Sequence, residues 1–255
     1  MNPDDILSAI SRISSTTIGQ LEQFSDFEWE TPSRCHMWAN KDVVAHLVAT
    51  LGFNLNSITM ALSGNNLPGE GMPNPGTFHS TDIAPGIASR AIQLSETSLR
   101  NKTTLLRALS DIQQDFNETC KTINESKWEL KAYHPVNMLS IAEILLIVLL
   151  ELTLHTWDIF NALQDDYVVD EESAILLVNL WQNSKANSWF IVAPSGDSPD
   201  VAPKVIDIDL GLKTKLRLTT YKGNLDIFEK PDAMDVASTT IQTSPTDFSL
   251  LITAR

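Results

Sequence analysis

Residues 144–158 read Ile-Leu-Leu-Ile-Val-Leu-Leu-Glu-Leu-Thr-Leu-His-Thr-Trp-Asp, an apolar run that leads into a carboxylate, an imidazole and a second carboxylate. A helix through this stretch is apolar on nearly all sides, which is typical of the buried central helix of a domain. Glu151 and His155 stand four residues apart, so their side chains emerge from one face of that helix, one turn apart. Because a buried carboxylate is costly unless it is paired or binds a metal ion, the stretch predicts a partner for Glu151.

Three interpretations of this stretch compete. A membrane span is excluded because four ionisable side chains lie between Glu143 and Asp158, within the roughly 20 residues that a span needs. The second interpretation is a core helix that carries a hydrogen-bonded Glu-His pair. The third is a metal site, in which one carboxylate and one imidazole on a bundle helix are completed by a third ligand from a facing helix.

His46 is the best candidate for that third ligand. The sequence predicts a helix there, with Asn40 as its N-cap and Asp42 in its first turn. His46 then lies about two turns into the helix, among core positions. A lone histidine at such a position is more often a satisfied core residue than a ligand. Together with Glu151 and His155, however, it makes a metal site a serious interpretation.

Two stretches of this chain resemble the signature sequences of the mycothiol-dependent maleylpyruvate isomerase family. The first is residues 38–47, Trp-Ala-Asn-Lys-Asp-Val-Val-Ala-His-Leu, and the second is residues 151–158, about 100 residues later. That family belongs to the larger DinB-like group of metal-binding four-helix bundles. The resemblance implies a small-molecule substrate and a zinc ion, or another divalent ion, held by His46, Glu151 and His155.

The resemblance extends to the end of the chain. Residues 216–218, Leu-Arg-Leu, and the closing residues 243–255 are similar to the small C-terminal domain of the family, which usually ends in a leucine-rich helix followed by Gly-Arg. In this chain Ala254 stands where the family has that glycine. The likeness implies that Arg255 occupies the position of an arginine that handles the substrate.

Two further groups of side chains lie close to these motifs in the sequence. Asp158 follows His155 by three residues and shares its helix face, so it either orients a ligand histidine or pairs with a group elsewhere. Cys35 and His36 precede the predicted helix of His46. Because they do not form a CxxC motif, the sequence favours an ordinary loop at this position over a metal-binding pair.

The hydrophobic pattern predicts an α+β protein with two domains, residues 1–190 and 191–255. The first is a four-helix bundle with one further helix, and the resemblance implies that the bundle is DinB-like. Its predicted helical segments are residues 2–24, 40–63, 87–123 with a break near 95–101, 139–158 and 170–189. A loop at residues 64–85 is rich in glycine and proline and contains His79, which is expected at the surface. In the second domain the period changes to two, and strands are predicted at residues 205–210, 215–221, 225–228 and 236–242, followed by a helix at 247–254.

Composition limits the classes of function. The 255 residues, 43% of them hydrophobic, suffice for a bundle and a smaller domain. The net charge of −14 argues against binding to nucleic acid or to an anionic membrane, because either partner requires a basic face. Two cysteines give no disulfide framework and the first residues show no signal-peptide pattern, so a cytoplasmic location is expected. The sequence does not indicate an oligomeric state.

Three protein ligands leave zinc with an open coordination position, as in catalytic sites. The resemblance implies that a low-molecular-weight thiol binds there as a thiolate, adds to the double bond of maleylpyruvate and leaves after rotation. If the thiol stayed attached, the enzyme would be an S-transferase. Two alternatives remain open: a metal enzyme of the same fold that activates water or substrate directly, and a non-catalytic metal-binding module. The three ligands favour an enzyme, but they do not distinguish a thiol from water.

Overall fold

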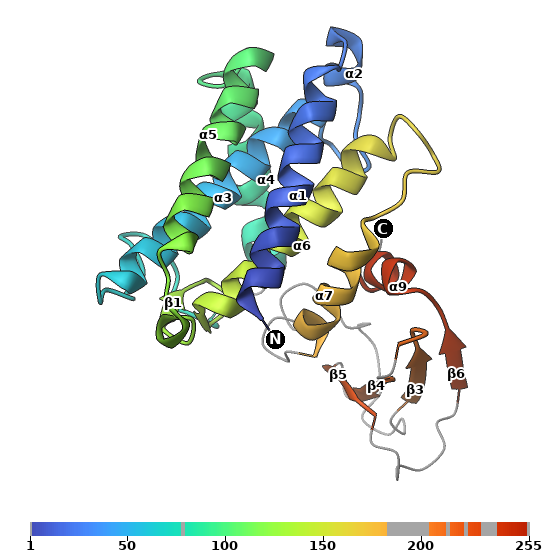
Figure 1. Cartoon of the computed structure of the whole chain (residues 1–255). Coiled ribbons are helices and arrows are strands. Elements are labelled where there is room, and N and C mark those ends of the chain that lie inside the picture. The colour runs from blue at the N-terminus through green and yellow to red at the C-terminus, as the bar shows by residue number, and fades with distance from the viewer. Residues whose placement is uncertain are drawn as a thin grey trace. The chain divides into compact units, whose positions relative to one another are not determined.

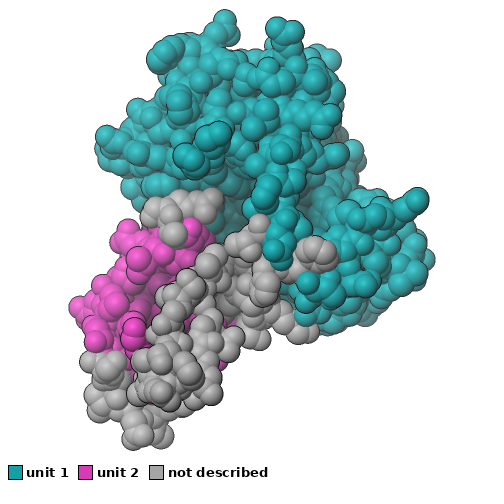
Figure 2. All heavy atoms as spheres, turned by 180° about the vertical axis from the view of Figure 1, so that it is seen from behind, with its two compact units in different colours: residues 1–173 teal, residues 174–255 magenta. Residues whose placement is uncertain are grey.

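The structure is a computed structural model, and it describes residues 2–77, 80–182, 204–212, 215–221, 224–230 and 239–253. The chain divides into two compact units, residues 1–173 and 174–255 (Figure 2). Helices dominate the first unit and a four-stranded sheet lies in the second, which confirms the predicted α+β class. The predicted domain boundary at residue 190 lies outside the described residues and stays a prediction.

Four long helices form a bundle in the first unit (Figure 1). They are α1 (Pro3–Glu22), α3 (Asn40–Leu62), α5 (Lys102–Lys121) and α6 (Ile141–Phe160). Helices α1 and α3 each contact both α5 and α6, so the four enclose one core. The short helix α2 (Asp26–Glu30) and the longer α4 (Ser80–Glu96) both pack on α3.

Helix α6 is the central helix that the apolar run predicts. Ser140 caps its N-terminus, and Glu143 bonds back to the Ser140 backbone in a capping box. Sixteen of its twenty residues are buried. Because the helix is covered on nearly all sides, it needs no polar face, which explains why its sequence lacks the amphipathic pattern of a surface helix.

Helix α3 begins differently from the prediction that Asn40 is its N-cap, which is wrong. Ala39 is the N-cap, and its backbone N–H donates to Asp42 Oδ2 at 2.9 Å. Asn40 is the first helical residue, and its side-chain amide donates to the carbonyl of Glu28 at 2.9 Å, which ties α2 to α3. Among the described helices, α3 alone is long and apolar enough to cross a membrane. Half of its most apolar 18-residue segment, however, is buried within the protein.

The connections of the bundle hold two differences from the sequence prediction. The break near residues 95–101 is confirmed, but α4 begins inside the predicted loop and contains Pro85, a residue that disfavours helix interiors. Between α5 and α6 lie a 3-10 turn and an antiparallel hairpin that the sequence did not predict: η1 (Glu125–Lys127), β1 (Lys131–Tyr133) and β2 (Met138–Ser140). Strands of three residues are too short to show an alternating pattern. His79 lies outside the described residues.

The sheet of the second unit has the strand order β5-β4-β3-β6. Its strands are β3 (Lys204–Asp209), β4 (Leu216–Tyr221), β5 (Asn224–Glu229) and β6 (Thr239–Gln242). Strand β3 runs antiparallel to β4 and parallel to β6, and β4 runs antiparallel to β5. Helix α7 (Glu171–Trp181) begins in the first unit and continues into the second, and α9 (Pro245–Ile252) follows the sheet. The strands predicted at residues 205–210, 215–221 and 225–228 are confirmed. The strand predicted at 236–242 is confirmed for residues 239–242, and its first three residues lie outside the described part of the chain.

A buried ion pair links two strands of this sheet. Arg217 Nε and Nη2 donate to the two carboxylate oxygens of Asp207 at 2.7 and 3.1 Å, and Lys230 Nζ lies 2.6 Å from Asp207 Oδ2. The hydrogen bonds from Arg217 and the charge of Lys230 hold the pKa of Asp207 at about 2, although burial opposes this shift. Arg217, the arginine of the Leu-Arg-Leu motif, therefore stabilises the sheet by joining β4 to β3.

Candidate metal centre

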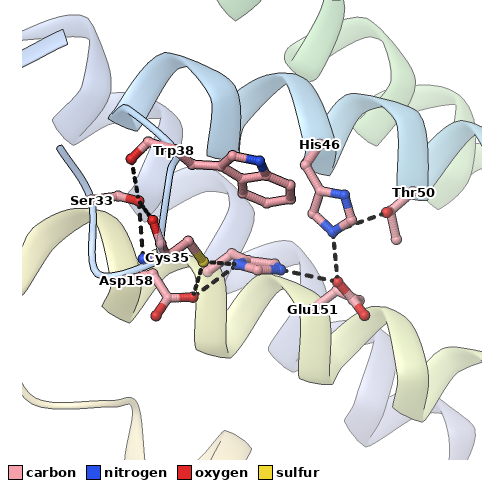
Figure 3. Close-up of polar contacts among 8 residues, drawn as sticks. Ser33, Cys35, Trp38, His46, Thr50, Glu151 and Asp158 are labelled. Carbon is pink, nitrogen blue, oxygen red and sulfur yellow. Dashed lines mark hydrogen bonds and ion pairs between the residues drawn. The ribbon is translucent and has the colours of Figure 1, made fainter. Parts of the chain in front are cut away.

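Three side chains from two helices converge inside the bundle (Figure 3). His46 comes from α3, and Glu151 and His155 come from one face of α6. His46 Nε2 lies 3.0 Å from Glu151 Oε2, and His155 Nε2 lies 3.3 Å from the same oxygen. The structure thus brings together the three residues that the sequence singled out as ligands, with all three donor atoms within 4.8 Å of one another.

The donor set fits a zinc-like divalent ion. Two imidazole nitrogens and one carboxylate oxygen are a ligand set of catalytic zinc sites, and bonds of about 2.0–2.1 Å in tetrahedral geometry separate such donors by about 3.3 Å. The separations of 3.0 and 3.3 Å from the Glu151 oxygen to the two imidazole nitrogens are close to this spacing. Three ligands would leave the ion open to a small molecule.

The surroundings of Glu151 keep its carboxylate charged, as an anionic metal ligand has to be. The two histidines are 7% and 8% exposed, and the Glu151 side chain is 18% exposed. Burial alone would raise the pKa of Glu151, but hydrogen bonds with His155 and His46 more than offset it, so this pKa lies below its ordinary range. Glu151 is therefore charged at neutral pH.

Asp158 lies behind His155, as the helix spacing predicts. Its Oδ2 is 2.9 Å from His155 Nδ1, and the residue is fully buried. Because a carboxylate can only accept a hydrogen bond, the imidazole Nδ1 donates the proton and Nε2 is left for the cluster. Burial lowers the pKa of His155, but the hydrogen bonds to Asp158, Cys35 and Glu151 raise it well above its ordinary value overall. A bound ion would compete with a proton for Nε2 of this imidazole.

The loop before α3 places a thiol beside two of these side chains. Cys35 Sγ lies 3.0 Å from Asp158 Oδ2 and 3.6 Å from His155 Nδ1 (Figure 3). The sequence favoured an ordinary loop position for Cys35, and the structure instead places it at the candidate centre. The loop folds back onto a helix more than 100 residues later in the chain, and no local spacing encodes such a contact.

Trp38 covers the two histidines with its indole ring. The ring centroids of Trp38 and His46 are 5.1 Å apart, and those of Trp38 and His155 are 6.1 Å apart. The ring supplies an apolar surface that limits the access of water to both imidazoles. Trp38 belongs to the first signature stretch, but the sequence assigned it no role. Arg255 lies outside the described residues, so its role stays a prediction.

Comparison with known proteins identifies a related family. A family model described as the mycothiol maleylpyruvate isomerase N-terminal domain matches residues 11–160, a range that contains all three candidate ligands. A crystal structure of the mycothiol-dependent maleylpyruvate isomerase has a TM-score of 0.63 at 13% identity, covering 98% of this chain and 88% of that chain. A histidine-to-alanine mutant of it has a TM-score of 0.62 at 12% identity, with the same coverage. At such identities these structures show a shared fold. No curated protein sequence matches the chain significantly.

Proposed function

This chain belongs to the mycothiol maleylpyruvate isomerase family, since the family model matches more than half of its length, and from that premise we propose a thiol-dependent isomerase. The enzyme would bind zinc and use a small-molecule thiol of the mycothiol type to isomerise a small electrophile of the maleylpyruvate type. The observation that carries the proposal is the convergence of His46, Glu151 and His155, which offers an ion three ligands and would leave it a further coordination position. S-transfer to a similar electrophile is the neighbouring reaction, because it needs the same thiol.

The side chains around the centre would each have a defined task. A zinc ion held by His46, Glu151 and His155 would supply Lewis acidity, which would lower the pKa of a bound thiol and favour its thiolate at neutral pH. Glu151 would contribute one negative charge and the two histidines would bind as neutral imidazoles, so a divalent ion with these three ligands would keep one positive charge, which favours an anionic further ligand. Asp158 holds the imidazole of His155 in one tautomer and one orientation.

The function is tested by an assay that follows both the substrate and the thiol. We expect zinc-loaded protein to convert maleylpyruvate to fumarylpyruvate when mycothiol is present, and the thiol to be recovered unchanged after many turnovers. Consumption of one thiol per substrate would indicate an S-transferase. Turnover at the same rate without any thiol would contradict the proposal and favour direct activation of water or substrate.

Arg255 is expected to bind the carboxylate of the substrate. A guanidinium binds a carboxylate through two parallel hydrogen bonds, which an alanine cannot replace and a lysine replaces only in part. We expect Arg255→Ala to lower kcat/KM at least tenfold, or about 1.4 kcal/mol of transition-state stabilisation, and Arg255→Lys to lower it less. Zinc content measured in parallel should stay at the wild-type level. Unchanged kinetics in Arg255→Ala would remove this residue from the substrate site.

A further inference from the structure

One carboxylate oxygen of Asp158 is shared by two donors. His155 Nδ1 lies 2.9 Å from Asp158 Oδ2, and Cys35 Sγ lies 3.0 Å from the same oxygen. Asp158 is fully buried, so if one of these donors were removed, water could not replace it as a hydrogen-bond partner of Oδ2. The thiol therefore acts on the same atom that orients the candidate ligand histidine.

The backbone of the loop fixes where this thiol lies. The N–H of Arg34 donates to the main-chain carbonyl of Asp158 at 2.9 Å, so the loop is bonded to α6 directly beside Cys35. The N–H of Cys35 donates to Ser33 Oγ at 3.1 Å, and that hydroxyl in turn donates to the carbonyl of Trp38 at 2.9 Å. None of these bonds uses the Asp158 carboxylate, so they position Cys35 by a separate set of contacts. Figure 3 shows Ser33, Cys35 and Trp38 together in this loop.

The contacts of Cys35 are those of a hydrogen-bond donor. A carboxylate has no proton to give, so the hydrogen between Cys35 and Asp158 must come from the sulfur. Cys35 lies on the Nδ1 side of the His155 ring. Glu151 contacts the opposite nitrogen, Nε2, so the thiol and the candidate metal site lie on different sides of this imidazole.

From this geometry we propose that Cys35 is a positioning residue of the metal centre, which raises metal affinity by holding Asp158 against His155. The inference rests on the proposed function, because it presupposes an ion held by the three ligands. Groups that orient a metal ligand typically change metal affinity 10- to 100-fold when they are removed. A cysteine in this place supplies a donor that is larger than a serine hydroxyl and weaker as a hydrogen-bond partner.

The first test measures zinc affinity by competition with a chelator. We expect Cys35→Ala to weaken zinc binding about 10- to 100-fold, and Cys35→Ser, which keeps a donor, to recover most of the loss. Cys35→Val fills the space of the thiol without a donor and should behave like Cys35→Ala, which provides a second variant should alanine impair folding. Cys120→Ala is the matched control, because Cys120 is a buried cysteine on α5, and it should leave zinc affinity unchanged.

The second test asks whether Cys35 acts through Asp158. In an Asp158→Ala background the carboxylate is absent, so Cys35→Ala should cause no further loss of zinc affinity. A loss that is the same in both backgrounds would show that Cys35 supports the fold generally, and it would overturn the proposal. Equal zinc affinity of wild type and Cys35→Ala would also overturn it while leaving the proposed function intact. Failure of the wild type to bind zinc would overturn both.

A cobalt-loaded protein separates a donor from a ligand. A thiolate bound to Co²⁺ gives a sulfur-to-metal charge-transfer absorption in the near ultraviolet, which histidine and carboxylate ligands do not give. We expect no such band in the wild type without added thiol, and a new band when mycothiol is added. A band that is present without added thiol and disappears in Cys35→Ala would identify Cys35 as a ligand and contradict the proposal.

Discussion

Replacing His155 with alanine is expected to reduce the bound zinc from about one ion per chain to a small fraction of that, and to abolish thiol-dependent turnover. In the proposed site His155 would supply one of three ligands and His46 another, so either variant would leave only two. The loss of affinity should exceed the 10- to 100-fold that is typical of groups which only orient a ligand. Elemental analysis after dialysis measures the metal content, and the isomerisation assay measures turnover.

A control for these variants is available in the same loop as Cys35. His36 is an exposed histidine close to the centre in sequence, and His36→Ala should keep both its zinc and its activity. Such a result would show that the loss in His155→Ala is not a general effect of removing an imidazole. Full zinc retention by both His46→Ala and His155→Ala would refute the proposed ligand set.

Removing the ion with a chelator is expected to lower the melting temperature by an amount on the order of 10 °C. An ion that binds only the folded state stabilises it by about 4 kcal/mol when the free ion is at 1,000 times its dissociation constant. Without the ion, the charged Glu151 would depend on its contacts with the two histidines inside the bundle. Calorimetry or circular dichroism of the apo and zinc-loaded protein measures the shift.

Glu151→Gln distinguishes the effect of the ion from other effects of the chelator. Glutamine has nearly the same shape but no charge, so the variant should melt below the zinc-loaded wild type and should respond little to chelation. Returning zinc to the apo wild type should restore the original melting temperature, which rules out damage by the chelator. If the wild-type curve stays the same after metal removal is verified, the three groups are joined by hydrogen bonds alone.

The parts of the structure that were predictable follow from local patterns. The apolar run determines α6, and the spacing of Glu151 and His155 places both on one face, because helix periodicity needs no knowledge of the rest of the chain. The long-range meeting of His46 with Glu151 was inferred from the need of a buried carboxylate for a partner and from the family resemblance.

The parts that were missed depend on the path of loops. The thiol of Cys35 reaches Asp158 because the segment before α3 turns back onto α6, and the sequence of the segment gives no measure of that turn. The cap of α3 was misassigned by one residue because Asn40 suits an N-cap, whereas Ala39 has no side-chain acceptor and the Asp42 carboxylate meets its N–H instead. The first outcome depends on a contact between residues distant in the sequence, and the second on a choice between two local caps.

The burial of α6 has a consequence for the timescales of the protein. Amide groups in a helix covered on nearly all sides exchange with solvent only when the whole bundle opens, so α6 should exchange among the slowest segments of the first unit. The loop before α3 differs, since Met37 is 80% exposed and adopts a left-handed φ of 70°. Backbone amides around Met37 should therefore exchange much faster than those of the helix that carries Glu151 and His155, so the two sides of the candidate centre should differ widely in their exchange rates.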